Sequence, residues 1–241
     1  MNVFDIGEEV KISDAVQFRD ELNPDVWENE QMKPVVRERL LAIAETFKEF
    51  LGVENLDVQD ITLSGSNAAY TYTPHSDIDL HLLIDVPNVD YSEVYRQLFD
   101  AKKFQFNESR TLRIKGYDVE LYVQDPNQPH ISAGIFSVLN NKWLSVPKKE
   151  KANIDDMSVI SKVEAFMTRI DNVIKTDNLL AAEDVWEDIK DMRKTGLHRE
   201  GEFSPENISF KLLRNNGYGG KIRDHIFHLR DKDLSLEQKS L

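Results

Sequence analysis

Residues 65–80 read Gly-Ser-Asn-Ala-Ala-Tyr-Thr-Tyr-Thr-Pro-His-Ser-Asp-Ile-Asp-Leu, and this stretch decides the fold of the chain. It predicts the end of a buried strand, a Gly-Ser turn, a short helical or looped segment, and a second strand that begins with two carboxylates. Because side chains alternate between the faces of a strand, Asp77 and Asp79 point to one face and the apolar residues between and after them point to a core.

Two carboxylates at the start of an apolar strand indicate a bound cation, because they repel each other unless a positive charge lies between them. A divalent cation with hard oxygen ligands, Mg²⁺ above all, fits Asp77 and Asp79. The turn at Gly65 and Ser66 supplies backbone N–H groups and a hydroxyl, which suit phosphate oxygens. Together these features predict a nucleotide bound with its Mg²⁺.

The pattern around this stretch predicts an alternation of helices and strands. A helix from Pro34 ends at Gly52, where a helix stop belongs, and residues 117–123 alternate cleanly as a strand. The other predicted elements are strands at 58–63 and 78–84, a helix at 91–101, alternating strand segments within 104–114, and a hairpin of 135–139 with 142–146.

The character of the chain changes after the charged run Lys148-Lys149-Glu150-Lys151. Apolar stripes then predict helices over 159–174, from Leu179 to about Gly196, from the N-cap Ser204, and from Ile222 after the Asn- and Gly-rich stretch 215–220. We therefore predict an α+β fold with a mixed or antiparallel sheet and flanking helices, followed by a helical domain. The predicted domains are an N-terminal arm (1–34), a catalytic core (35–150) and a helical domain (151–241).

The central stretch also resembles a known motif. The Gly-Ser pair, Ala68, Pro74 and the Ser-Asp-Ile-Asp-Leu of residues 76–80 resemble the core motif of the polymerase-β-type nucleotidyltransferase superfamily. The likeness is closest to the minimal and antibiotic nucleotidyltransferase branches. Asn67 and Tyr70 stand where small members often have Arg and Gly.

The resemblance implies a third carboxylate on a neighbouring strand, flanked by apolar residues. Glu120, between Val119 and Leu121, is the favoured candidate, and Asp118 on the same face is the rival. The implied catalytic and metal-binding residues are Asp77, Asp79 and Glu120, which would hold two Mg²⁺ ions, with Mn²⁺ as a possible substitute. Gly65 and Ser66 would bind the NTP.

The resemblance further implies Mg²⁺-dependent transfer of a nucleoside monophosphate from an NTP such as ATP to an acceptor hydroxyl, with release of pyrophosphate. The formal net charge of −13 disfavours a long nucleic acid as partner, because affinity for polyanions comes largely from cationic groups. We therefore favour a small molecule or a protein as acceptor. The alternatives are a catalytically inactive nucleotide-binding or sensor module and an RNA 3′-end nucleotidyltransferase.

The sequence also predicts the cellular setting. It contains no cysteine, which fits a reducing compartment. It shows neither a membrane-spanning apolar run nor a basic segment before an apolar one at the N-terminus, so we expect no membrane partner and a cytoplasmic protein.

Overall fold

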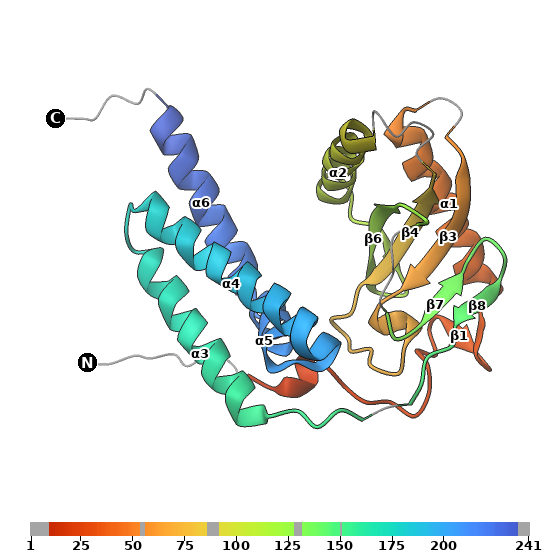
Figure 1. Ribbon diagram of the computed structural model, residues 1–241, viewed down its shortest axis with the longest axis horizontal. Helices are drawn as coiled ribbons and strands as arrows, with labels where there is room; N and C mark the ends of the chain where they lie inside the picture. Colours follow the sequence, from red (N-terminus) through yellow and green to blue (C-terminus); the bar gives the residue numbers. More distant parts are fainter. Residues whose placement is uncertain (1–9, 54–55, 86–91, 128–131, 150, 236–241) are drawn as a thin grey trace. The chain divides into compact units, whose positions relative to one another are not determined.

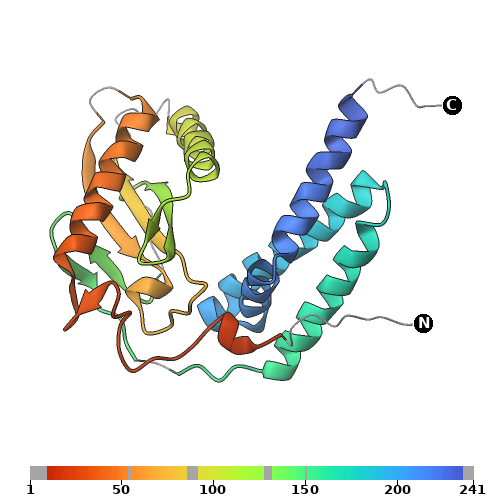
Figure 2. The ribbon, with the colours of Figure 1, turned by 180° about the vertical axis from the view of Figure 1, so that it is seen from behind.

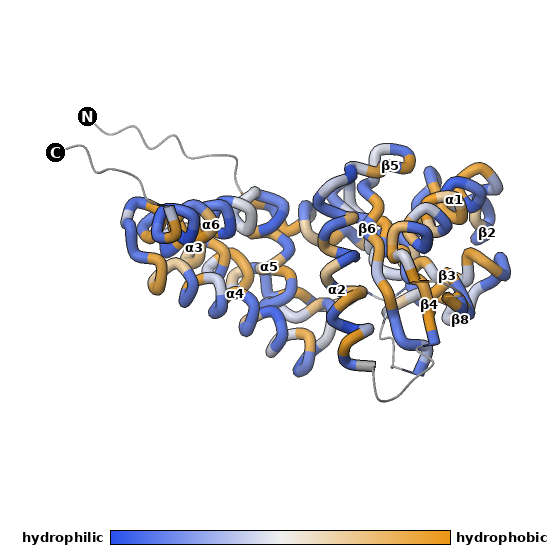
Figure 3. The backbone as a smooth tube through the Cα atoms, turned by 90° about the horizontal axis from the view of Figure 1, so that it is seen from above, coloured by the Kyte–Doolittle hydropathy of each residue, from blue (hydrophilic) through white to orange (hydrophobic). Residues whose placement is uncertain are grey.

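The computed structural model describes residues 10–53, 56–85, 92–127, 132–149 and 151–235 (Figures 1 and 2). The chain forms two compact units: one spans residues 17–150, and the other combines residues 1–16 with residues 151–241. Within the second unit, Figure 3 shows hydrophobic and hydrophilic residues alternating along the helices, as expected when each helix buries one face.

The first unit is built on a six-stranded mixed sheet with the order β5-β6-β4-β3-β7-β8. The pairing of β4 with β6 is parallel, and the other pairs are antiparallel. This confirms the predicted α+β class with a mixed sheet. The strands are β3 (Val58–Ser64), β4 (Ile78–Ile84), β5 (Arg113–Ile114), β6 (Tyr117–Gln124), β7 (Ile135–Ser137) and β8 (Lys142–Ser145).

Two helices, α1 (Pro34–Leu51) and α2 (Ser92–Ser109), pack against the sheet and against each other. Helix α1 begins with Pro at its first position and ends at Gly52, whose left-handed φ of 67° suits a residue without a side chain. The sequence predicted both ends. The core between helices and sheet includes the fully buried side chains of Leu40, Phe47, Leu63, Ile78, Leu80, Leu82, Phe106 and Leu121.

The predicted strand segments within residues 104–114 are mostly wrong. Helix α2 continues to Ser109, and only Arg113 and Ile114 form a strand. The reason is the burial of Phe99 and Phe106, which lie two helical turns apart on one face, while Phe104 is 57% exposed. The Phe106 ring packs against Phe47 of α1 at a centroid distance of 4.9 Å. The alternation of Phe104 and Phe106 therefore does not reflect a strand.

The residues before α1 divide between the two units. A hairpin of β1 (Trp27–Glu28) and β2 (Gln31–Met32) belongs to the first unit, where the Trp27 ring stacks on Trp143 at 4.6 Å. The short helix η1 (Ile12–Asp14) belongs to the second unit, where the Asn215 amide donates to the Asp14 carbonyl at 2.7 Å. The stretch predicted as an arm thus contains parts of both units.

The second unit consists of α3 (Asp156–Val173), α4 (Leu179–Glu200), η4 (Gly201–Phe203), α5 (Pro205–Asn215) and α6 (Tyr218–Leu234), together with η1. The predicted N-cap is confirmed, since the Ser204 hydroxyl accepts the Asn207 N–H at 3.2 Å. Among the described residues no helix is long and apolar enough to cross a membrane.

Two predicted boundaries in this unit are wrong. Helix α4 does not end near Gly196 but passes through it to Glu200. A Cβ at Gly196 would lie 2.6 Å from the Cβ of Glu206 and 2.6 Å from the Ser204 hydroxyl, so this glycine permits close packing and does not stop the helix. The break at 215–220 is also shorter than predicted, because α6 already begins at Tyr218.

Candidate active site

A row of polar side chains crosses three strands on the sheet face opposite the core. Asp79 on β4 lies directly beside Ser64 on β3 and directly beside Glu120 on β6. Residues in register on neighbouring strands share a face, so Ser64, Asp79 and Glu120 form one line, which we call the carboxylate row. The alternation predicted for β4 is confirmed: Ile78, Leu80, Leu82 and Ile84 are buried, and the intervening side chains are partly exposed.

Gly65 brings the end of β3 into close approach with Asp79. A Cβ at position 65 would lie 1.9 Å from the Asp79 Oδ2 atom, and the φ of Gly65 is 74°. Both the space and the backbone conformation therefore require glycine. The Gly-Ser signal in the sequence thus marks the point where the turn after β3 meets the carboxylate of β4.

The third-carboxylate candidates differ in their surroundings. Glu120 lies in the carboxylate row, and its Oε2 atom accepts a hydrogen bond from the Tyr122 hydroxyl. Asp118 instead pairs with Arg113 of β5, whose Nε lies 2.5 Å from Asp118 Oδ1, and the two side chains are 51% and 61% exposed. The geometry therefore brings Glu120, and not Asp118, to the side of Asp79.

A second row of side chains lies on the same face, two residues away from the carboxylate row on each strand, and contacts it. Thr62, His81 and Tyr122 lie in register on β3, β4 and β6. The His81 ring stacks on the Tyr122 ring at 4.8 Å, and its Nε2 lies 3.1 Å from the Ser64 hydroxyl. His81 thereby links the two rows.

The pKa of Tyr122 is affected by the negative charge of the site. Burial raises the pKa of its phenol, and the charges of Asp79, Glu120 and Asp77 raise it further, together with the hydrogen bond to Glu120. The phenol therefore stays protonated and donates to Glu120. The sequence placed Tyr122 on the polar face of its strand but gave no sign of this contact, because it depends on the rotamers of two side chains.

The predicted phosphate-binding groups make internal hydrogen bonds. The Ser66 hydroxyl donates to the Ser76 hydroxyl at 2.7 Å, and the Gly65 N–H donates to the Ser132 hydroxyl at 3.2 Å. Ser132 in turn donates to the Gly134 carbonyl at 3.1 Å. Sequence reasoning missed Ser132, since it lies 67 residues from Gly65 along the chain.

The donor chemistry of the site fits a hard cation. Among the described residues no three His, Asp or Glu side chains are gathered closely enough to form a metal site as they stand. Asp79 and Glu120 nevertheless supply adjacent carboxylates, and Asp77 lies near enough for its charge to act on Tyr122. Carboxylate oxygens are the ligands that Mg²⁺ prefers. The residues therefore fit Mg²⁺ by donor type, with the Glu120 carboxylate directed toward Tyr122.

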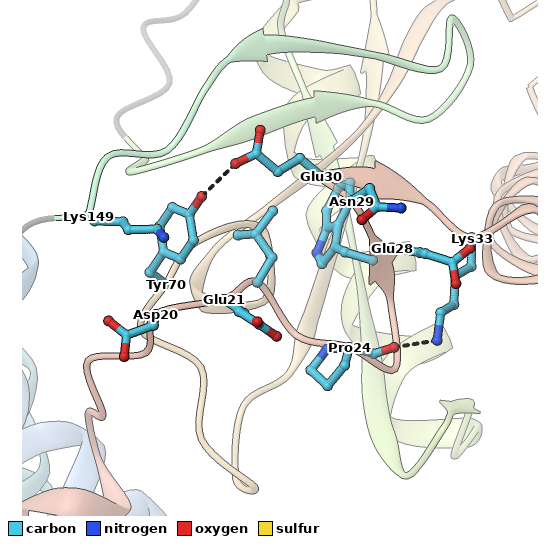
Figure 4. Close-up of a pocket in the computed structure, with 11 residues that line it drawn as sticks. Asp20, Glu21, Pro24, Glu28, Asn29, Glu30, Lys33, Tyr70 and Lys149 are labelled. Carbon is cyan, nitrogen blue, oxygen red and sulfur yellow. Dashed lines mark hydrogen bonds between the residues drawn. The ribbon is translucent and has the colours of Figure 1, made fainter.

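A separate cavity of about 400 Å³ lies beside the β1–β2 hairpin, and none of the predicted site residues lines it (Figure 4). Its wall includes Trp27, Glu30 and Tyr70, and the Tyr70 hydroxyl donates to Glu30 at 3.1 Å. The Lys149 ammonium lies 5.1 Å from the centre of the Tyr70 ring. Tyr70, which stands where small family members often have Gly, thus belongs to this cavity.

Comparison with known proteins identifies a domain family within the first unit. Residues 40–141 match the family model described as "Nucleotidyltransferase domain". This range contains Gly65, Asp79 and Glu120. No curated protein matches the sequence.

A comparison of structures finds the STING-associated CdnE c-di-GMP synthase from Capnocytophaga granulosa. The match has 14% sequence identity and a TM-score of 0.23, and it covers 87% of this chain and 90% of that chain. On the family match, residues 40–141 of this chain are a nucleotidyltransferase domain.

Proposed function

We propose that this protein is a nucleotidyltransferase that transfers a nucleoside monophosphate from an NTP to an acceptor hydroxyl in a Mg²⁺-dependent reaction that releases pyrophosphate. One observation carries the proposal: Asp79 lies between the glycine of the Gly-Ser turn on one side and Glu120 on the other. This juxtaposition combines a candidate phosphate-binding turn with carboxylates that suit a divalent cation.

Each residue of the site has a proposed role. Asp77, Asp79 and Glu120 would hold two Mg²⁺ ions, or Mn²⁺ ions in their place. Bound there, the ions would offset the phosphate charge and lower the pKa of the acceptor hydroxyl. Gly65 and Ser66 would bind the NTP phosphates through backbone N–H groups and the hydroxyl. This requires the Gly65 N–H to exchange Ser132 for the ligand and the Ser66 hydroxyl to turn from Ser76 toward it.

The reaction itself is an in-line displacement. The acceptor oxygen forms a bond to the α-phosphorus while the bond from that phosphorus to the pyrophosphate oxygen breaks. The acceptor loses its proton, and pyrophosphate leaves. The contribution of the protein is to position the two oxygens and the triphosphate, a task that suits the paired strands β4 and β6 with Asp79 and Glu120 side by side.

The acceptor that we favour is a small molecule or a protein. The formal net charge of −13 would repel a long nucleic acid over most of the surface. Arg113, the cationic residue of β5, is paired with Asp118. An RNA 3′ end is therefore the less favoured acceptor.

Label transfer tests this proposal. The protein is incubated with each α-³²P-labelled NTP and Mg²⁺ or Mn²⁺, alone and with a fractionated cell extract. The matched control is the Asp77→Asn/Asp79→Asn double variant, with its fold checked by circular dichroism. We expect label to move into one fraction with the wild type alone. Metal-dependent NTP binding without transfer or pyrophosphate release would contradict the proposal and favour an inactive nucleotide-binding module.

A further inference from the structure

Asn67 is a buried polar residue with every group of its side chain engaged. It is fully inaccessible to solvent, as is Asn23 from the segment before the β1–β2 hairpin. The Asn67 Nδ2 donates to the Asp77 carbonyl at 2.8 Å, and its Oδ1 accepts from the Asn23 Nδ2 at 2.7 Å. The backbone carbonyl of Asn67 also accepts a hydrogen bond, from the Trp27 indole N–H at 2.7 Å.

The direction of these hydrogen bonds is fixed by chemistry. The Asp77 carbonyl can only accept, so the Asn67 atom that faces it must be the amide NH₂. The Asn67 oxygen then faces Asn23, which must present its own NH₂. The remaining oxygen of Asn23 accepts the backbone N–H of Asp25 at 3.0 Å, as this assignment requires. Both amides therefore have one orientation that satisfies all their partners.

The hydrogen bond from Asn67 to Asp77 joins the two ends of the segment that connects the Gly-Ser turn to β4. Asn67 lies in the short helix η2 (Ser66–Ala68), directly after Gly65, and Asp77 directly precedes β4. The two residues are ten positions apart. The hydrogen bond therefore links the Gly-Ser turn to the backbone of Asp77. Asn23 and Trp27, which precede α1, both donate hydrogen bonds to Asn67.

We propose that Asn67 is a positioning residue of this active site, which acts through the backbone of Asp77 and is itself oriented by Asn23. The inference rests on the proposed function, because it assigns Asp77 to the metal site. An outer residue that orients a ligand typically changes metal affinity by about 10- to 100-fold when it is lost. Asn67 would then orient Asp77 as a metal ligand through its backbone carbonyl.

The test compares Asn67→Leu with Asn207→Leu. Asn207 is 2% exposed, and its Nδ2 donates to the Glu202 carbonyl at 2.7 Å within the helical unit. Both substitutions remove a buried amide at similar volume and are expected to lower the melting temperature. Free Mn²⁺ is measured by electron paramagnetic resonance with a non-hydrolysable NTP analogue present, and kcat and KM are measured for transfer.

We expect Asn67→Leu to weaken Mn²⁺ binding by about 10-fold or more and to lower kcat, while Asn207→Leu stays within about twofold of the wild type. If Asn67→Leu does not fold, Asn23→Ala decides, because it leaves Asn67 in place and removes the donor that orients it. Its expected effect is a smaller loss in the same direction.

Wild-type Mn²⁺ affinity in Asn67→Leu, or in Asn23→Ala where that variant decides, would overturn the inference and leave the proposed function intact. Equal losses in Asn67→Leu and Asn207→Leu would also overturn it, because the effect would then be one of stability. A wild-type protein that neither binds Mn²⁺ nor transfers label would overturn the proposed function and this inference together.

Discussion

The Asp79 carboxylate occupies the space that a side chain at position 65 would need. Its Oδ2 atom lies 1.9 Å from the ideal position of a Cβ on Gly65, whose φ is 74°. A strand end and a carboxylate from the neighbouring strand are thus in direct contact, at the point where the triphosphate is proposed to meet the metal ions.

Replacement of Gly65 by Ala is expected to abolish most of the activity. The new methyl group would displace the Asp79 carboxylate and strain the backbone, and a misplacement of about 1 Å at a catalytic group can cost roughly 10²-fold in rate. Initial rates of label transfer at saturating NTP measure this effect. The Gly116→Ala variant is the control, since Gly116 also has positive φ but nothing lies within 4 Å of its Cβ position. Equal loss in both variants would contradict the steric explanation.

The third carboxylate is tested by Glu120→Gln against Asp118→Asn. Glu120 lies beside Asp79, whereas Asp118 pairs with Arg113 at an exposed position. We expect the Glu120 variant to lose roughly 10²-fold or more in transfer rate and the Asp118 variant to stay within about twofold, because exposed ion pairs contribute little. The reverse result would assign the metal-binding role to Asp118.

The ionisation of Tyr122 gives a pH-dependent effect on stability. Its pKa is raised in the folded protein by burial and by the neighbouring carboxylates. Only the unfolded chain ionises as the pH passes the ordinary value of about 10, so the contribution of Tyr122 is complete below that pH and is lost above it. The loss amounts to at most about 1.4 kcal/mol per pH unit.

Urea unfolding at pH 8 and pH 11, in buffer with a metal chelator, measures this difference for the wild type and Tyr122→Phe. The wild type is expected to lose more stability over this range than the variant, because all other titrating groups are shared. Identical losses would show that the phenol ionises in the folded protein as it does in the unfolded chain.

Replacement by Ala is expected to change the stability of the protein in opposite directions at two glycines of the helical unit. At Gly196 a Cβ would clash with Glu206 and Ser204, so Gly196→Ala is expected to destabilise the protein by about 1–3 kcal/mol. At Gly220, within α6, nothing lies within 4 Å, so Gly220→Ala is expected to stabilise it by roughly 0.5–1 kcal/mol. Thermal unfolding of both variants measures the sign, and a stabilising Gly196→Ala would contradict the close packing of α4 on α5.

The sequence predicts the parts of the site that lie along one strand. The alternation from Ile78 to Ile84 gives the buried face, and the Gly-Ser pair marks the turn that Asp79 approaches. Contacts between distant segments are not encoded in any local pattern. The sequence therefore does not predict the hydrogen bonds that the turn makes with Asn23, Trp27 and Ser132.

Local periodicity was also misleading where tertiary packing decides the element. Phe104 and Phe106 alternate as in a strand, but Phe106 is buried against Phe47 as part of α2. Gly196 resembles a helix stop, but its missing side chain serves the contact with α5. In both cases the deciding contact comes from a residue outside the window in which the pattern is read.

The most direct test of the central claim is a crystal structure with Mn²⁺ and a non-hydrolysable NTP analogue, read by anomalous diffraction. We predict Mn²⁺ peaks bound by the carboxylates of Asp77, Asp79 and Glu120, with the triphosphate at Gly65 and Ser66 and the Glu120 carboxylate turned away from Tyr122. A bound nucleotide with no Mn²⁺ at these carboxylates, or with Mn²⁺ held by Asp118 and not by Glu120, would contradict the account.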